Sequence, residues 1–354
     1  MYLAIPNSFF IPVCYVDDIF NIEETIQVQE YISQSCFLNK LEAREELVIG
    51  VSLPTQRDER WVRDRKAMEA YAKEKKVTLK IEICEYDVVK QISQVKNLIS
   101  QGIDILILVA VDVKTAGAMV EMVRNAGVKL VTYEALIINT DIDIFVGFNH
   151  LRAGQIQGRF LITKVPKGNY IIMYADLPYD TFLKDGAMDF ITPLVIIGNI
   201  KIVAVGSIKD WSPKIASSFM ENALISNNKI DAILAPNDSI AGVAIEVLQK
   251  QGLAGKVVVT GMDAELSAIR RIIKGTQAMT LFKDTRESAR KTIDVAIKLG
   301  NGEKVLTDEW MYNGKNHIPS ILITPVFVDK DNIDEVLIKS GYLTKEDIYG
   351  SNIQ

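Results

Sequence analysis

Histidine and cysteine are scarce in this chain of 354 residues, which has two histidines and three cysteines. His150 and His317 stand apart from each other and from any cluster of cysteines or acidic residues, so no set of metal ligands is apparent. An odd number of widely spaced cysteines does not make a disulfide framework either. Cys84 alternates with isoleucines in a strand-like run, and we expect it to be a buried core thiol. We therefore predict no metal site and no bound cofactor.

Long apolar runs and basic clusters are also missing. Residues 2–16 are apolar, but they are interrupted by Pro6 and Pro12, and a membrane-spanning helix needs ~20 apolar residues. This segment is either the remnant of a signal or membrane anchor, or an apolar N-terminus without such a role. Residues 1–46 hold eight acidic and two basic residues, a net charge of −6, so the overall −5 leaves +1 for the rest. Such an acidic start is unlike a DNA-binding headpiece, and we predict no nucleic-acid partner.

The sequence has no motif that announces catalysis. Neither a GxxxxGK[ST] loop nor a GxGxxG loop follows a predicted strand, and no serine occupies a nucleophile elbow. An enzyme such as an isomerase or dehydrogenase would need a metal set or a dinucleotide loop. A transcription repressor would need a basic helix-turn-helix at its N-terminus. Both alternatives lack their key feature, and we predict a protein that is not an enzyme.

Residues 17–46 form a separate N-terminal feature. Apolar residues recur there at broadly helical spacing, and no glycine or proline interrupts them. We predict an acidic amphipathic helix, whose charge disfavours an anionic lipid surface. The helix either binds a protein partner, which also allows a dimer, or docks on the chain's own globular body.

From residue 46 onward, strands and helices alternate. Alternation with helices of 10–15 residues predicts parallel sheets with right-handed crossovers. The pattern starts twice, so we predict an α/β protein with two Rossmann-like, doubly wound lobes. The predicted strands cover 47–53, 77–84, 103–111, 129–133, 143–148, 170–174, 201–205, 230–235, 257–260, 278–282 and 321–328. The predicted helices cover 60–75, 89–101, 114–126, 151–163, 213–225, 241–249, 264–273 and 285–299.

Polar side chains follow many of these apolar runs. In open parallel sheets, ligands bind beyond the carboxyl ends of the strands, where such loops gather. Guanidinium, ammonium, carboxylate, amide and indole groups together suit a small polyhydroxylated molecule. The candidates are Arg60, Trp61, Asp112, Glu134, Asn237, Asp263 and Lys283.

Each candidate also has a purely structural interpretation. Arg60 lies in a charged stretch, and Trp61 has the spacing of a core residue. Asp263 is placed to cap a helix that starts at residue 264, and Lys283 has acidic neighbours at 284 and 287. Asp238 is predicted to be the N-cap of the following helix rather than a ligand of the sugar.

Several segments resemble periplasmic-type sugar-binding proteins, most of all D-xylose-binding proteins. They occur in one consistent order from about residue 46 to about residue 342. The segments are VIGVSLPTQRDERW at 48–61, KGNY at 167–170, NNKIDA at 227–232, ND at 237–238, GMDA at 261–264, GTQAMT at 275–280, FK at 282–283 and LGNG at 299–302.

The resemblance implies a type I fold in which three chain crossings form a hinge and one monosaccharide lies in the cleft. The expected lobes are 47–148 with 284–318, and 149–283 with 319–354, preceded by 1–46. The resemblance adds Trp211 as a second aromatic position to the seven candidates. Three features depart from the family pattern: Ala135 replaces an arginine, Met262 replaces a common glutamine, and the 174–181 loop is short.

A receptor for a neutral pentose, D-xylose first, is the function that the resemblance implies. We expect it to work outside the cytoplasm, in association with the membrane. The acidic N-terminal helix favours signalling to a membrane sensor histidine kinase in a two-component system. The alternative is the substrate-binding component of an ABC sugar transporter, which would hand sugar to a permease.

Overall fold

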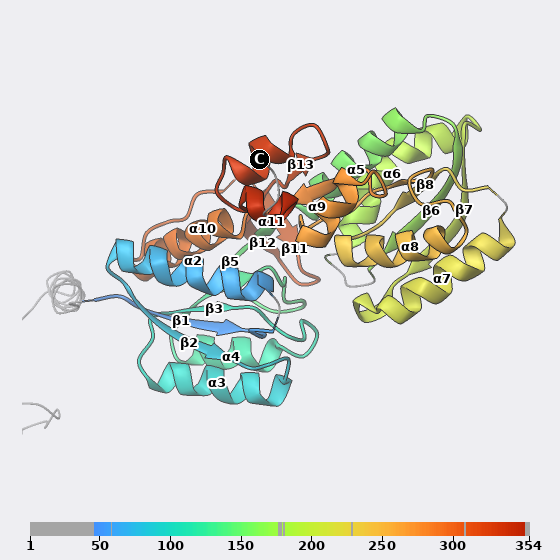
Figure 1. The fold of residues 1–354 in the computed structure, drawn as a ribbon. Helices are drawn as coiled ribbons and strands as arrows, with labels where there is room; N and C mark the ends of the chain where they lie inside the picture. Colours follow the sequence, from blue (N-terminus) through green and yellow to red (C-terminus); the bar gives the residue numbers. More distant parts are fainter. Residues whose placement is uncertain are drawn as a thin grey trace, which may run out of the picture. The chain divides into compact units, whose positions relative to one another are not determined.

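The computed structural model describes residues 46–57, 59–175, 179, 181–227, 229–307 and 309–350 (Figure 1). The chain divides after Glu46, and Leu47–Gln354 forms one compact unit. The predicted N-terminal helix and the apolar segment 2–16 lie outside the described residues. Within the described part, no helix is both long enough and apolar enough to cross a membrane.

The larger sheet has the strand order β11-β12-β5-β4-β3-β1-β2. All neighbouring strands are parallel except β11 and β12, which are antiparallel. The order β2-β1-β3-β4-β5 is that of a doubly wound fold, with its switch point between β1 and β3. The strands are β1 (Val48–Leu53), β2 (Thr78–Ile83), β3 (Ile105–Leu108), β4 (Lys129–Tyr133), β5 (Ile144–Phe148), β11 (Glu309–Tyr312) and β12 (His317–Ile323).

Strand β3 is apolar throughout because helices cover both faces of this sheet. Ile105 and Ile107 pack in the core cluster of α2 and α10, whereas Leu106 and Leu108 pack in that of α3 and α4. Figure 1 shows α2 beside α10 on one face, with α3 and α4 on the other. These helices are α2 (Glu59–Lys75), α3 (Val88–Ser100), α4 (Gly117–Asn125) and α10 (Thr285–Gly300).

The second sheet repeats this plan with parallel strands in the order β7-β6-β8-β9. Helices α5 and α6 pack on one face, and α7 and α8 pack on the other. A separate antiparallel pair, β10 (Thr280–Phe282) and β13 (Val326–Val328), belongs to the same lobe. The other elements are β6 (Gly168–Tyr174), β7 (Ile200–Ser207), β8 (Ala232–Leu234), β9 (Val258–Val259), α5 (His150–Lys164), α6 (Thr181–Ile196), α7 (Pro213–Ser226), α8 (Asp238–Lys250), α9 (Leu266–Ile273), a π-helix (Asp334–Ile338) and α11 (Lys345–Tyr349).

The chain passes between the lobes three times. It leaves the larger sheet after β5, returns between β10 and α10, and leaves again between β12 and β13. The predicted α/β fold with two doubly wound lobes is confirmed. Cys84 is fully buried, as expected of a core thiol.

One predicted strand is wrong, and helix α6 was not predicted. Residues 321–328 do not form one strand, because β12 ends at Ile323 and β13 begins at Val326 in another sheet. Pro325 lies in this break, and its nitrogen cannot donate a hydrogen bond to a sheet. Helix α6 has no clear signal in the sequence, because it contains Gly186 and Pro193 and so has low intrinsic helix propensity. A side chain at Gly186 would collide with the backbone of α5, so this glycine permits the close α5–α6 contact.

Candidate functional site

The eight predicted binding residues all follow strands of the two lobes, as the apolar runs predict for seven of them; the eighth, Trp211, is the position that the resemblance added. They come after β1 (Arg60 and Trp61), β3 (Asp112), β4 (Glu134), β7 (Trp211), β8 (Asn237), β9 (Asp263) and β10 (Lys283). Three of them, Arg60, Asp263 and Lys283, line one cavity of about 480 Å³. Glu134 and Trp61 contact Arg60 directly. Neither these two nor Asp112, Trp211 and Asn237 line the cavity themselves.

Arg60 lies in the first turn of α2 and is held by two carboxylates. Its Nη2 is 2.6 Å from Glu134 Oε2, and its Nε is 3.4 Å from Asp64 Oδ2. Burial alone would lower the pKa of Arg60, but the charges of Glu134 and Asp64 outweigh burial and raise that pKa well above its usual value. The guanidinium therefore stays charged. Its charge is compensated within the site.

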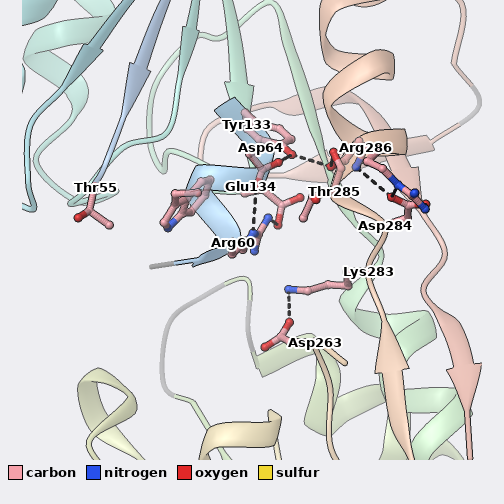
Figure 2. Close-up of polar contacts among 12 residues, drawn as sticks. Thr55, Arg60, Asp64, Tyr133, Glu134, Asp263, Lys283, Asp284, Thr285 and Arg286 are labelled. Atoms are coloured by element: carbon pink, nitrogen blue, oxygen red, sulfur yellow. Dashed lines mark hydrogen bonds and ion pairs between the residues drawn. The ribbon is translucent and has the colours of Figure 1, made fainter. Parts of the chain in front are cut away.

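The carboxylate behind Arg60 belongs to a buried network. Asp64 accepts a hydrogen bond from the Tyr133 hydroxyl, which lies 2.6 Å from Ser288 Oγ at the start of α10. Burial raises the pKa of Asp64 to about 6, although the charge of Arg60 opposes this shift. Figure 2 shows Asp64 and Tyr133 next to the Arg60–Glu134 pair. The network fixes the position of Arg60 from the side away from the cavity.

Asp263 and Lys283 form the second ion pair at the cavity. Lys283 Nζ is 2.8 Å from Asp263 Oδ1, and the two side chains are 8% and 28% exposed (Figure 2). Burial acts to raise the pKa of Asp263, but the charge and hydrogen bond of Lys283 outweigh it and hold that pKa below its usual value. The structural interpretations of both residues are wrong. Asp284 pairs with Arg286 instead of Lys283, and α9 starts at Leu266 with Glu265, not Asp263, at its N-cap.

Several buried polar atoms around these pairs have no well-aligned hydrogen bond among the described residues. They are Arg60 Nη2, Glu134 Oε1, Asp263 Oδ1 and Thr285 Oγ1. The first and third take part in the ion pairs, but without the alignment of a hydrogen bond. Buried groups of this kind are costly to leave unpaired, so they favour a ligand that both donates and accepts hydrogen bonds.

Trp61 packs in the core, as its spacing suggested, and it also lies beside Arg60. Its ring lies 4.6 Å from the Arg60 guanidinium and meets Tyr133 edge-on, with 6.4 Å between ring centroids. The side chain is half-buried and packs against the core cluster of α2 and α10. An indole beside a guanidinium gives the site an apolar flat surface as well as charge.

The other predicted residues have local partners. Asp112 accepts hydrogen bonds from Lys114 N at 2.9 Å and Thr115 Oγ1 at 2.7 Å, and the Thr115 bond is the main cause of its lowered pKa. Trp211 ends a short 3-10 helix with a positive φ of 53°. Asn237 is the N-cap of α8, since its Oδ1 accepts from Ile240 N at 2.9 Å.

The prediction that Asp238 caps α8 is therefore wrong. Asp238 is the first residue of the helix, and its side chain is fully buried. Its carboxylate accepts hydrogen bonds from Gln277 Nε2, Thr280 Oγ1 and Glu265 N. Asparagine takes the cap because the helix starts one residue earlier than its polar pattern suggests.

Sequence reasoning also missed five residues that line the cavity. They are Arg63, Glu265, Ser267, Thr285 and Tyr342. Arg63 lies three residues after Arg60 on the same helix, so helical spacing contains a usable signal for it. Tyr342 comes from the C-terminal segment, and its ring lies 4.7 Å from the Arg63 guanidinium and 5.1 Å from that of Arg286. No pattern in the sequence near Tyr342 predicts that this residue lines the cavity.

Among the described residues, no group of three or more histidine, cysteine, aspartate and glutamate side chains is placed to hold a metal ion. The cavity lining instead offers three cations, two carboxylates and three hydroxyl groups, and the Trp61 indole lies beside Arg60. Donors and acceptors of both charges suit the hydroxyl groups of a polyol.

Comparison with known proteins agrees with this chemistry. A family model described as a periplasmic binding protein domain matches residues 49–304. The chain is 36% identical to the D-xylose-binding periplasmic protein of Haemophilus influenzae, over 86% of this chain and 93% of that protein. It is 30% identical to the multiple sugar-binding periplasmic receptor ChvE of Rhizobium radiobacter, over 88% and 95%. Among solved structures, a carbohydrate transporter solute-binding protein from Chloroflexus aurantiacus, in complex with D-glucose, matches with a TM-score of 0.77 and 28% identity, over 86% of this chain and 98% of that one.

Proposed function

This chain belongs to the periplasmic binding protein family, a family of binding proteins and not of enzymes, and on that premise we propose that it is an extracytoplasmic receptor for a neutral pentose, D-xylose first. Relatives named for D-xylose binding at 36% identity support the choice of sugar.

The observation that carries this proposal is the internal charge balance of the cavity. Arg60 is paired with Glu134 and Lys283 with Asp263, at 2.6 and 2.8 Å. Arg63 and Glu265 add one charge of each sign to the cavity lining, so an anionic or cationic ligand would disturb a balance that already exists. A neutral polyol keeps both pairs and supplies donors and acceptors to their remaining lone pairs and N–H groups.

All eight predicted residues are proposed as the sugar-binding set. Asn237 supports this because its Oδ1 caps α8 while its Nδ2 has no partner among the described residues, leaving a donor for a hydroxyl. Asp112, which follows β3, and Trp211, which follows β7, are also proposed to contact the sugar. Ala135 and Met262 remove hydrogen-bonding capacity where relatives of this kind carry polar side chains, and both pack in core clusters here. A ligand with few exocyclic groups fits this reduced set better than a larger hexose.

The proposed mechanism is hinge closure about the three crossings. A sugar shifts an open–closed equilibrium only through contacts that exist in the closed form. Moving from mostly open to mostly closed needs roughly 5 kcal/mol of differential affinity, and charge-assisted hydrogen bonds contribute about 1.5–3 kcal/mol each. Two such hydrogen bonds, one to Arg60 in one lobe and one to Asp263 in the other, therefore contribute free energy of the required order.

Calorimetry against a panel of sugars tests the proposal. D-xylose, D-ribose, L-arabinose, D-galactose and D-glucose are titrated beside xylonate, the anionic oxidation product of xylose. We expect saturable binding of a neutral pentose and at least a hundredfold weaker binding of xylonate. Absence of binding by every neutral sugar, or preference for xylonate, would overturn the proposal.

The output of the receptor is proposed to be a membrane sensor histidine kinase. The acidic segment 1–46 supports this, because it precedes the family match, which begins at residue 49. The second candidate is delivery to an ABC transporter, favoured by the transporter-associated structures that match the chain. The two are separated by deleting residues 1–45 and measuring binding to the purified extracytoplasmic domain of a candidate kinase and to a reconstituted permease. The sensor proposal requires that sugar affinity survive and kinase binding be lost, and undiminished kinase binding would refute it.

A further inference from the structure

The loop that carries Asp263 has an unusual backbone. Asp263 has φ of 107° and Ala264 has φ of 51°, so two consecutive residues with side chains lie in the left-handed region. Such conformations are sparsely populated for residues other than glycine, and they persist only where surrounding contacts impose them. The contacts that impose this one therefore decide where the Asp263 carboxylate points.

A buried carboxylate supplies these contacts. Asp238 Oδ2 accepts hydrogen bonds from Glu265 N at 3.0 Å and from Thr280 Oγ1 at 2.8 Å. The Thr280 oxygen in turn accepts from Ala264 N at 3.2 Å. The Asp238 backbone N–H donates to Met262 O at 2.8 Å, and Asp263 N donates to Leu281 O at 2.8 Å. Residues 262–265 are thus held at four consecutive positions.

The same carboxylate is locked on its other side. Asp238 Oδ1 accepts from Gln277 Nε2 at 2.7 Å, and Gln277 Oε1 accepts from Arg271 Nε at 2.9 Å. Arg271 Nη2 also donates to the Asp238 carbonyl oxygen at 2.7 Å. A side chain at Gly261 would collide with both Asp238 and Gln277, so glycine there leaves the room that this arrangement needs.

We propose that Asp238 and Thr280 are positioning residues for the sugar-binding carboxylate Asp263. They hold the loop 262–265 in its binding conformation before sugar arrives, so the sugar does not have to impose the two left-handed residues itself. Neither residue lines the cavity. The inference rests on the proposed function, in that it takes Asp263 to be a ligand of the sugar.

Thr280→Val tests this directly, because valine has nearly the same shape but neither donates to Asp238 nor accepts from Ala264 N. We expect a Kd for xylose about tenfold higher, since the dissociation constant rises as the binding-competent fraction of the loop falls. Thr280→Ser keeps the hydroxyl and should bind within about twofold of the native protein. Asp238→Asn has one acceptor oxygen instead of two and should resemble Thr280→Val.

The matched control is Thr292→Val. Thr292 is also fully buried, and its hydroxyl donates to Ser288 O at 2.7 Å, but it has no hydrogen bond to the Asp263 loop. We expect Thr292→Val to lower the melting temperature while leaving the Kd unchanged. An effect on Kd confined to Thr280→Val and Asp238→Asn separates positioning from general loss of stability.

A sugar-free crystal structure of Thr280→Val completes the test. We expect Asp263 and Ala264 to leave positive φ and the Asp263–Lys283 pair to separate. A loop identical to that of the native protein, with an unchanged Kd, would overturn the inference and leave the receptor function intact. If the native protein bound no sugar, the proposed function would fail, and the conformation of the variant loop would still decide whether Asp238 and Thr280 hold it.

Discussion

Replacing Asp263 by asparagine removes one negative charge from the cavity and leaves nearly every atom in place. The lysine that it pairs with, Lys283, is only 8% exposed and would be left as a buried unpaired cation. We therefore expect two separate effects, one on the stability of the sugar-free protein and one on its affinity for sugar.

The size of each effect follows from the geometry. Removing one partner of a fully buried ion pair costs about 3–5 kcal/mol, and because Asp263 is 28% exposed we expect about 2–3 kcal/mol here. For sugar binding, a carboxylate that accepts from two hydroxyls contributes hydrogen bonds of about 1.5–3 kcal/mol each. Asparagine removes the negative charge that strengthens these hydrogen bonds. We expect this loss to weaken sugar binding by roughly 3 kcal/mol, or roughly a hundredfold in Kd.

A second substitution separates the two effects. In the double variant Asp263→Asn, Lys283→Met, the unpaired cation is gone, so most of the lost stability should return. Affinity should not return, because the carboxylate is still missing. The matched control is Asp143→Asn, since Asp143 also pairs with a lysine, Lys129 at 3.4 Å, and is similarly exposed at 32%, but does not line this cavity.

Urea unfolding measures the stability of each variant, and calorimetry with xylose measures its affinity. Native-like affinity in Asp263→Asn would remove the residue from the binding site. Recovery of affinity in the double variant would refute the reasoning in another way, since it would mean that a stranded lysine, not a lost carboxylate, had weakened binding.

Three further predictions concern the same site. Asn237→Ala should lose both sugar binding and about 1 kcal/mol of unfolding free energy, because it removes the N-cap of α8. Asn237→Ser should keep the helix cap and lose only sugar binding. Equal stability of the two variants in urea would contradict the capping role. Glu134→Gln removes a negative charge beside Arg60, so the cavity becomes more positive. In calorimetry, the ratio of the affinity for xylonate to the affinity for xylose should rise about tenfold. An unchanged ratio would count against charge balance as the basis of selectivity. Burial raises the pKa of folded Asp64 to about 6 from an ordinary 3.8, so between these pH values the folded state binds more protons than the unfolded state. As the pH falls from 7 to 5, the native protein should therefore gain about 1 kcal/mol of unfolding free energy relative to Asp64→Asn. Parallel pH profiles of the two proteins would refute this.

Much of the fold is encoded in patterns that a sequence displays directly. The continuous apolar stretch around β3 predicts a strand that is covered on both faces. All four residues of β3 are buried, as this prediction requires. Helix α6 shows the limit of this approach. Its glycine and proline lower local helix propensity, and the close contact with α5 that stabilises it is invisible in either segment alone.

The candidate site divides in the same way. That polar residues cluster after strands is a property of doubly wound sheets, so the positions of Arg60, Glu134, Asp263 and Lys283 were predictable in outline. Their partners were not. Lys283 is adjacent to Asp284 in sequence but pairs with Asp263, and Tyr342 reaches the cavity from the far end of the chain. Pairing depends on how loops from different strands approach each other, which periodicity does not encode.

The route of the chain through its two lobes also bears on how the protein is made. Strand β12 pairs with β5, although about 170 residues separate them, and β13 pairs with β10 only after β12 has been synthesised. A nascent chain therefore exposes the open edge of β5 until translation has passed residue 323, and that of β10 until it has passed residue 328. A fragment that ends before β12 lacks the partner strands of β5 and β10, so we expect it to be more prone to aggregation than the whole chain.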